Sequence, residues 1–433
     1  MTMLKLSQLL PLMLAASCGS GSGNGGQAST ATGGASTTGG APGAGTSGST
    51  ATGGNSSVTS NSGDALGVGG TSTASVGNAI VGIQQVALGN HHACALLQDR
   101  TVKCWGGNGS GQLGDGTTID RTTAVAVAGL SDVTAISAGG WNSCAILVDG
   151  SVRCWGDNSA SQLGDGTTAN ASTTSVVVVG LSNAIGVAPG SDHCCAVFVD
   201  GTAKCWGSNV FGQIGTGTIL EQHLSPTLVS GLSGAEQVAV GAMRSCARMN
   251  DGTAKCWGTN LNGILGDGST TTSLVPVPVR DLSNVGQISV GWDHSCATTT
   301  SGSVMCWGVN GNGGLGDGTT AVRVSPVAVQ GLSNALSVAA GFGHSCAVRR
   351  GGSVSCWGWN LAGGLGDGSV VDRLTPVTTQ GLSSASAVVT GEFTSCAIVG
   401  DGKVMCWGSN DNGQLGNGTT VTSLTPVTVQ GSP

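Results

Sequence analysis

Fourteen of the sixteen cysteines form seven pairs, and the two members of each pair are ten residues apart. Two cysteines can join in a disulfide or bind zinc as thiolates. The Cys-x-x-Cys pairs of common zinc sites do not occur in this sequence, which favours disulfides. We therefore predict seven bridges, with zinc as the alternative: Cys94–Cys104, Cys144–Cys154, Cys195–Cys205, Cys246–Cys256, Cys296–Cys306, Cys346–Cys356 and Cys396–Cys406.

Cys194 and Cys18 are left over in this scheme. Cys194 is either a free thiol or a competitor of its neighbour Cys195 for the same bridge. Residues 1–17 have an early lysine, a short apolar stretch and small residues before Cys18, as a secretory signal peptide does. The ending resembles a bacterial lipobox, although Leu14 is four residues before the cysteine instead of three. The resemblance makes Cys18 the expected lipid acceptor, with an ordinary signal peptide as the alternative.

Histidines and aspartates also recur at fixed positions of a repeat. His92, His193, His294 and His344 share one position, which we interpret as a local hydrogen-bonding residue at a turn rather than a ligand. Aspartates stand in Gly-Asp-Gly turns, where an Asx turn explains them better than calcium, because each loop offers one carboxylate. They are Asp115, Asp165, Asp267, Asp317 and Asp367.

These residues supply no catalytic set that we recognise. The sequence shows no nucleophile–base pair, no phosphate loop and no paired acids on one element. We expect no metal and no cofactor, and we assign no catalytic residue. Catalysis stays an open alternative, and a pair of carboxylates or a His–acid pair in the channel described below would favour it.

The elements that position these residues are repeats of about 50 residues. The tripeptide Cys-Trp-Gly recurs seven times, at steps of 50 or 51 residues. The sixth copy contains four strand-like runs, at 336–340, 345–348, 353–357 and 376–379. Four short antiparallel strands per repeat are typical of a propeller blade. We therefore predict an all-β fold, a seven-bladed β-propeller of four-stranded antiparallel blades, closed by strands from both chain ends.

The cysteine spacing also predicts a hairpin register. In the second copy, Cys144 opposes Cys154 if residues 147 and 151 close a three-residue loop that ends in Gly150. A type I turn with a bulge needs a left-handed residue at that place, which suits glycine. Arg100 replaces the glycine in the first copy, so a different or strained turn is expected there. The seven Cys-Trp-Gly tryptophans are interpreted as packing between blades.

Composition limits the other classes. The chain has 78 glycines among 433 residues, 3% aromatic residues and a net charge of −7. Glycine is costly in helices, so a string of helical domains is excluded. Fifteen scattered basic residues do not form a phosphate-binding surface, so nucleic acid is not an expected partner. Residues 18–75 are rich in Gly, Ser and Thr and are expected to be a disordered linker, which leaves 76–433 for the propeller.

The repeat resembles a known family. The fifth copy reads Gly-Trp-Asp-His-Ser-Cys-Ala from Gly291, Cys-Trp-Gly-Val-Asn from Cys306 and Leu-Gly-Asp-Gly-Thr from Leu315. This pattern resembles the regulator-of-chromosome-condensation repeat over residues 76–433. The resemblance implies the propeller fold. The family's founder is a guanine nucleotide exchange factor on chromatin, but light receptors, ligase-associated propellers and a secreted inhibitor of β-lactamase share the repeat. Fold alone therefore does not imply the activity.

One end of the propeller is the expected binding face. The turns after the first strand and the loops after the third strand should meet there, and they carry variable aromatic and Met residues. The candidate residues are Trp141, Trp292, Phe342, Phe393, Met243, His91 and Trp359. The alternative is that these aromatic side chains only fill the mouth of the channel.

Three functions are consistent with this sequence. The first is a monomeric binding scaffold for a protein or glycan, outside the cytoplasm. It would be held at the outer membrane or cell surface only by a lipid anchor, or else secreted. The second is a lyase or hydrolase that acts on polysaccharide in the channel, and the third is a structural envelope protein. Guanine nucleotide exchange is disfavoured by secretion.

Overall fold

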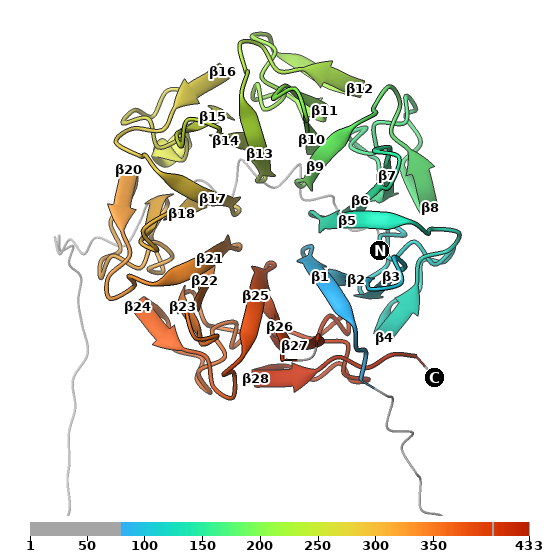
Figure 1. Cartoon of the computed structure of the whole chain (residues 1–433), viewed down its shortest axis with the longest axis vertical. Coiled ribbons are helices and arrows are strands. Elements are labelled where there is room, and N and C mark those ends of the chain that lie inside the picture. Colours follow the sequence, from blue (N-terminus) through green and yellow to red (C-terminus); the bar gives the residue numbers. More distant parts are fainter. Residues whose placement is uncertain (1–78, 401, 433) are drawn as a thin grey trace, which may run out of the picture. The chain divides into compact units, whose positions relative to one another are not determined.

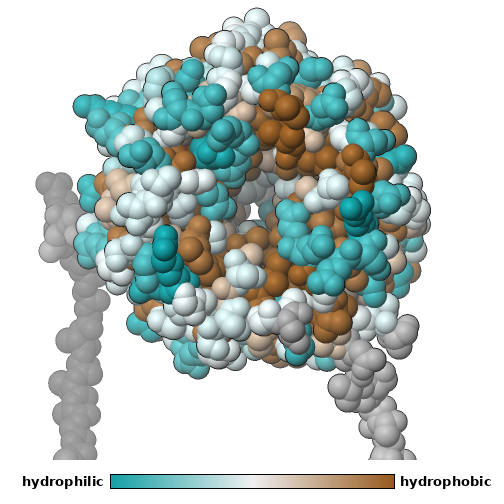
Figure 2. Space-filling view, viewed as in Figure 1, coloured by the Kyte–Doolittle hydropathy of each residue, from teal (hydrophilic) through white to brown (hydrophobic). Residues whose placement is uncertain are grey.

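The computed structural model describes residues 79–400 and 402–432, and they form seven four-stranded antiparallel sheets. Each sheet consists of four consecutive strands, so blade 1 is β1–β4 and blade 7 is β25–β28. The blades stand around a common centre (Figure 1), where the space-filling view shows an opening, here called the channel (Figure 2). The predicted all-β, seven-bladed propeller is therefore confirmed. The predicted signal peptide, the lipidated Cys18 and the linker lie outside the described residues.

The first strand of each blade lies nearest the centre of the ring, and the fourth is at the rim (Figure 1). The first strands are β1 (Ile83–Leu88), β5 (Val133–Ala138), β9 (Ala184–Pro189), β13 (Ala235–Val240), β17 (Val285–Val290), β21 (Ala335–Ala340) and β25 (Ala385–Thr390). The second strands are β2 (His92–Leu97), β6 (Asn142–Leu147), β10 (His193–Phe198), β14 (Arg244–Met249), β18 (His294–Thr299), β22 (His344–Arg349) and β26 (Thr394–Val399).

The outer half of each blade completes the sheet. The third strands are β3 (Val102–Gly106), β7 (Val152–Asp157), β11 (Ala203–Asn209), β15 (Ala254–Gly258), β19 (Val304–Gly308), β23 (Val354–Gly358) and β27 (Lys403–Gly408). The fourth strands are β4 (Arg121–Ala126), β8 (Ala171–Val177), β12 (Leu220–Leu228), β16 (Ser273–Pro278), β20 (Arg323–Ala328), β24 (Arg373–Thr378) and β28 (Ser423–Thr428). A 3₁₀ turn, η2 (Leu261–Gly263), follows β15.

The fourth strand was the least accurate prediction. In blade 6 it begins at Arg373, three residues before the predicted start. Its first residues pair with β23 across a bulge, where Gly358 opposes Arg373. The strand has no buried residue, so its hydrophobic pattern carries little signal.

All seven predicted disulfides are present, and each joins the two central strands of one blade. Cys144 opposes Cys154 as the predicted register requires, with their Cα atoms 4.1 Å apart. The Leu147 amide donates to the Ser151 carbonyl at 3.0 Å, which closes the loop. Zinc is therefore not needed to explain these pairs. Bridges within single blades stiffen each blade but do not tie the ring together.

Arg100 adopts the same turn as the glycines, so of the two expected alternatives, a different turn or a strained one, the strained turn is present. Its amide donates to the Leu97 carbonyl at 3.0 Å, as Gly150 does to Leu147 at 2.9 Å. Arg100 has φ 64°, against 74° for Gly150, and is therefore held in the left-handed region that disfavours side chains.

Each tryptophan of Cys-Trp-Gly packs against the blade before its own, which confirms their predicted role. Trp155 is fully buried in one cluster with Cys94 and Cys104 of blade 1. Its Nε1 also donates to the Gln112 carbonyl of that blade at 2.9 Å. Equivalent bonds of 2.8 to 3.2 Å are made by Trp105, Trp206, Trp257, Trp307, Trp357 and Trp407.

The repeated histidines link blades, so the interpretation as local turn residues was wrong. Nε2 of each one lies 2.8 or 2.9 Å from a serine Oγ of the next blade, in the pairs His92–Ser143, His193–Ser245, His294–Ser345 and His344–Ser395. Where Arg244 takes the place, it reaches Ser295 at 3.0 Å. Burial lowers the pKa of His92, His193 and His344 to about 3. These three side chains are therefore neutral in the folded protein.

Seven glycines close the ring at one end of the channel. They directly follow the first strand of each blade: Gly89, Gly139, Gly190, Gly241, Gly291, Gly341 and Gly391. A Cβ on any of them would come closer than 3.0 Å to the carbonyl oxygen of the next glycine around the ring. Gly391 meets Gly89 in this way, which completes the circle. Only glycine permits so close an approach of backbone to backbone.

The two ends of the propeller that the structure describes join by single bridges and do not share a blade. Ala79 bridges Gln430, and Gly431 bridges Ala124 in the outer strand of blade 1. The prediction that strands from both ends would close the ring was therefore wrong, because every blade is built from consecutive strands. Within residues 79–432, no helix has the length and hydrophobicity needed to cross a membrane.

We predict that Arg100→Gly stabilises the protein. The substitution removes the strain of an arginine in the left-handed region, which stabilises the folded state. Glycine also makes the unfolded chain more flexible, which offsets part of this gain, so the free energy of unfolding should rise by about 0.5–1 kcal/mol. Urea unfolding followed by tryptophan fluorescence measures this. Gly150→Ala, which puts a side chain in the left-handed region in blade 2 and a Cβ 2.7 Å from the Asn183 amide nitrogen, should lower the free energy of unfolding. An unchanged or lower midpoint for Arg100→Gly would show that the turn is unstrained.

The buried histidines predict acid sensitivity. Their folded-state pKa of about 3 is below the usual 6.5, so the unfolded chain takes up protons first as the pH falls. The contribution of these histidines to stability is fully present above pH 6.5. As the pH falls from 6.5 to 3, each histidine lowers the free energy of unfolding by about 1.4 kcal/mol per pH unit. In the variant His344→Asn, the free energy of unfolding should therefore fall less steeply between pH 7 and pH 5, by the contribution of one histidine. Equal slopes for the variant and its parent would contradict this prediction.

Candidate binding face at one end of the channel

Two sets of loops meet at the glycine end of the channel. At the end of each third strand, or directly after it, a backbone amide donates a hydrogen bond to the turn between the first and second strands of the same blade. Examples are Asp157 to Trp141 at 2.9 Å, Trp359 to Gly343 at 3.0 Å and Ser409 to Phe393 at 3.0 Å. The hairpin loops instead bond with the connections between blades, at the other end. The two-face arrangement expected from the sequence is thus present.

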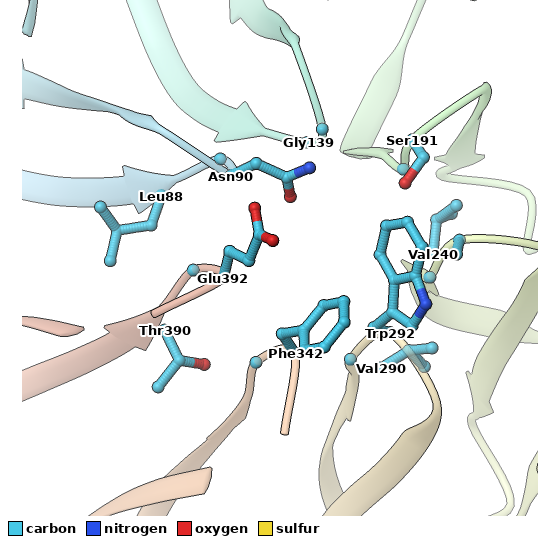
Figure 3. A pocket seen from close by; sticks show the side chains of 18 of the residues that line it. Leu88, Asn90, Gly139, Ser191, Val240, Val290, Trp292, Phe342, Thr390 and Glu392 are labelled. Carbon is cyan, nitrogen blue, oxygen red and sulfur yellow. The ribbon is translucent and has the colours of Figure 1, made fainter. Parts of the chain in front are cut away.

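A pocket occupies the mouth of the channel, and every blade supplies three consecutive residues to its wall. These are the last residue of the first strand, the ring glycine and the residue after it. The third of these positions varies most, and its seven occupants are Asn90, Gly140, Ser191, Ala242, Trp292, Phe342 and Glu392. Figure 3 shows Trp292, Phe342 and Glu392 directed toward the centre of the pocket.

Four of the predicted residues form one cluster, here called the aromatic arc: Trp292, Phe342, Trp359 and Phe393. The Phe342 ring lies 5.2 Å from Trp292, 5.8 Å from Trp359 and 5.6 Å from Phe393, between ring centroids. Trp359 and Phe393 meet edge to face at 4.9 Å. The arc spans blades 5, 6 and 7, and all four side chains are half-buried. It presents a continuous aromatic surface beside the mouth.

The other predicted residues are not in the arc. Trp141 is in blade 2 and Met243 in blade 4, each one position beyond the residue that lines the pocket. No aromatic ring of residues 79–432 stacks on Trp141 in the way that the rings of the arc stack on one another. The sequence placed all these residues on one face, but their distance around the ring depends on which blade carries them.

His91 pairs with an acid that has no role in the sequence-based predictions. Its Nε2 lies 3.3 Å from Oε2 of Glu392, across the seam between blades 1 and 7. The Glu392 side chain is 19% exposed and that of His91 34%. Burial raises the pKa of Glu392, and the nearby His91 opposes this rise. The two residues lie near opposite ends of the propeller sequence, so only ring closure brings them together.

Further acids surround the mouth. Burial, with a contribution from Asp157, raises the pKa of Asp192 to about 6. Asp157 accepts hydrogen bonds from Gln162 and Ser159, both at 2.8 Å. The two positions that follow each ring glycine contain Asp192, Asp293 and Glu392 but no lysine or arginine. Arg244, three residues after its ring glycine, is buried, and its guanidinium offsets the charge of Asp293. The acids outnumber this one cation, so the mouth is acidic.

The remaining candidates are structural. Asp115 accepts from the Thr117 amide at 2.9 Å, as an Asx turn requires, and is paired with Arg121 at 2.7 Å. Among residues 79–432, no three His, Cys, Asp or Glu side chains gather as they would around a metal ion. Cys194 is a buried free thiol that donates to the Gln162 carbonyl at 3.1 Å, and burial raises its pKa to about 12. It therefore does not compete with Cys195.

This arrangement can support two kinds of chemistry. Aromatic rings beside an acidic mouth can bind apolar, stacking or cationic groups. A histidine next to a carboxylate can also transfer protons.

Comparison with known proteins agrees with the fold. Two sequence models described as "Regulator of chromosome condensation (RCC1) repeat" match the chain. One matches residues 83–112, 133–162, 185–213, 285–313, 336–363 and 385–414. The other matches residues 102–146, 200–248, 251–298, 301–348 and 401–433, which is about half of the chain.

Curated relatives match over part of their length. The ultraviolet-B receptor UVR8 of Arabidopsis thaliana is 29% identical over 197 residues, 44% of each chain. The probable E3 ubiquitin-protein ligase HERC4 of Homo sapiens is 39% identical over 198 residues, 45% of this chain and 19% of that one. The chain therefore covers less than half the length of these relatives.

Solved structures share the architecture. Human WBSCR16 has a TM-score of 0.66 at 23% identity, covering 73% of this chain and 87% of that one. Prp20p from Saccharomyces cerevisiae has a TM-score of 0.68 at 19% identity, covering 81% and 87%. At such identities the likeness concerns the fold alone. Since the repeat model covers half of the chain and the seven blades follow its period, the chain belongs to the regulator of chromosome condensation (RCC1) repeat family.

Proposed function

We propose that this protein is a binding scaffold that recognises a protein partner through the aromatic arc at the mouth of its channel. The observation that carries the proposal is the contact of four half-buried aromatic side chains from three blades on one open face. Such clusters with a polar surround are typical of interface centres. A glycan, which also stacks on aromatic rings, is the competing ligand.

The surroundings of the arc favour a role in binding over a role in filling the channel. Figure 2 shows an opening at the centre of the ring, so the aromatic side chains do not fill the channel. The arc also covers three blades on one side, whereas a plug would be expected to draw on the whole circle. Prp20p, which has the same fold, binds Gsp1p and histones, so protein recognition is familiar for this architecture.

We also propose that binding takes place outside the cytoplasm. Seven disulfides within blades are typical of an oxidising compartment. Residues 1–17 and Cys18 support the same location as a lipoprotein signal, with attachment to the outer membrane or cell surface. A small GTPase is a cytoplasmic or nuclear partner, so guanine nucleotide exchange fits this location poorly.

The arc predicts which substitutions abolish binding. Trp292→Ala with Phe342→Ala should reduce capture of a partner from envelope extract at least tenfold, because the centre of the contact is lost. Trp141→Ala is the matched control, since it removes one half-buried tryptophan of the same face outside the arc. Quantitative mass spectrometry of captured proteins measures the effect. Protease treatment of the extract should abolish capture, whereas glycosidase treatment should not.

Equal capture by the double variant and its parent would exclude the arc as the binding surface. Loss of capture after glycosidase alone would assign the arc to a glycan.

A second function is favoured by the His91–Glu392 pair, because a His–acid pair at the channel is the feature expected of an enzyme. In that case the protein would cleave a polysaccharide held in the mouth, with these two side chains as acid and base. Incubation with envelope polysaccharides should then release reducing ends or unsaturated sugars, and Glu392→Gln should stop the release. Absence of both products with the parent protein removes this candidate.

A further inference from the structure

The chemistry of the mouth pocket depends on three side chains. Its wall contains the seven ring glycines and, at the variable position, the small or polar residues Asn90, Gly140, Ser191 and Ala242. Trp292, Phe342 and Glu392 are the large side chains at that position, and they come from consecutive blades. Two aromatic rings and one carboxylate thus face the same small space (Figure 3).

The carboxylate of Glu392 lacks a permanent counter-ion. Its side chain is 19% exposed, so it has lost much of its hydration. Its ion-pair partner is His91, which is positive only when protonated. The neighbouring turn positions contain no lysine or arginine. A half-buried carboxylate in this condition gains from a cation placed beside it.

The two rings favour the same kind of ligand. The faces of aromatic rings are electron-rich and attract ammonium and guanidinium groups within about 6 Å. Phe342 and Trp292 lie 5.2 Å apart between centroids, so one group can contact both. Asp157 and Asp192 add negative potential around the mouth. The charge of Asp293 is offset by the buried Arg244, which donates to the Trp292 carbonyl at 2.9 Å. A neutral apolar group would satisfy the rings but leave Glu392 without a counter-charge.

We propose that this pocket binds the side chain of a lysine or arginine that the protein partner inserts into the mouth of the channel. The cation lies between Glu392 and the rings of Phe342 and Trp292, and the aliphatic stem lies against the ring glycines. The inference rests on the proposed binding function and names the chemistry of its central contact. An extended side chain suits the pocket because the mouth opens on the same face as the aromatic arc.

The test uses small probes with the full chain. Capped lysine (Nα-acetyl-lysine N-methylamide) and capped arginine are titrated by saturation-transfer NMR, and capped norleucine, which has the lysine stem without the charge, is the neutral control. At least one cationic probe should bind tenfold or more tightly than norleucine. Glu392→Gln should remove that difference, and Phe342→Leu should weaken the cationic probe more than norleucine.

Control variants separate this effect from general charge and from misfolding. Asp281→Asn removes an exposed acid from a connection between blades, at the other end of the channel, and should leave binding unchanged. All variants should keep the thermal midpoint of the parent within a few degrees, since the contacts of Glu392 and Phe342 between blades are half-buried and the substitutions leave the buried tryptophan and His–Ser contacts between blades intact.

Three outcomes overturn the inference. The first is that capped lysine, capped arginine and capped norleucine bind equally well. The second is that Glu392→Gln leaves the binding of the cationic probes unchanged. The third is that the free polyamine spermidine binds while neither capped lysine nor capped arginine does. If partner capture still depends on the arc but not on Glu392, the proposed binding function stands and the cation pocket falls.

Discussion

The carbonyl oxygen of Gln112 accepts hydrogen bonds from two side chains of the next blade, at 2.9 Å from Trp155 and 3.1 Å from Ser143. The same serine contacts His92 of the first blade at 2.8 Å. This junction repeats around the ring with small changes. It satisfies buried polar groups while the tryptophan ring covers the disulfide of the preceding blade. Neighbouring blades are therefore joined by similar buried contacts.

The changes at the junctions are coupled between blades. Where the serine is replaced by Cys194, the thiol donates to the Gln162 carbonyl in its place, and Asn142 takes the place of the histidine. Where Arg244 takes the place of histidine, it donates to Ser295 and to two backbone carbonyls of the next blade. A residue at one position therefore makes physical sense only beside its partner about 50 residues later.

The ring glycines connect this framework with the candidate site. They bring the first strands together by backbone contact, so the width of the mouth does not depend on the side chains that follow. The next position in each turn is then free to vary. Trp292, Phe342 and Glu392 occupy that position in three adjacent blades, where the rigid ring holds them together. Variation on a fixed frame is how loops of rigid folds acquire binding function.

The sequence by itself determined the repeat, the blades, the hairpin register and the seven bridges, because each depends on residues within one period of the chain. It also placed Trp141 and Trp292 on one face, since equivalent loops lie at the same end. Only the tertiary structure decided that Trp292 joins an arc while Trp141 does not, and that His91 meets Glu392 across the seam. The same holds for the histidines, which bond to the next blade rather than to their own turn. These contacts depend on how the blades close into a ring, and a local pattern contains no information about which distant residues that closure brings together.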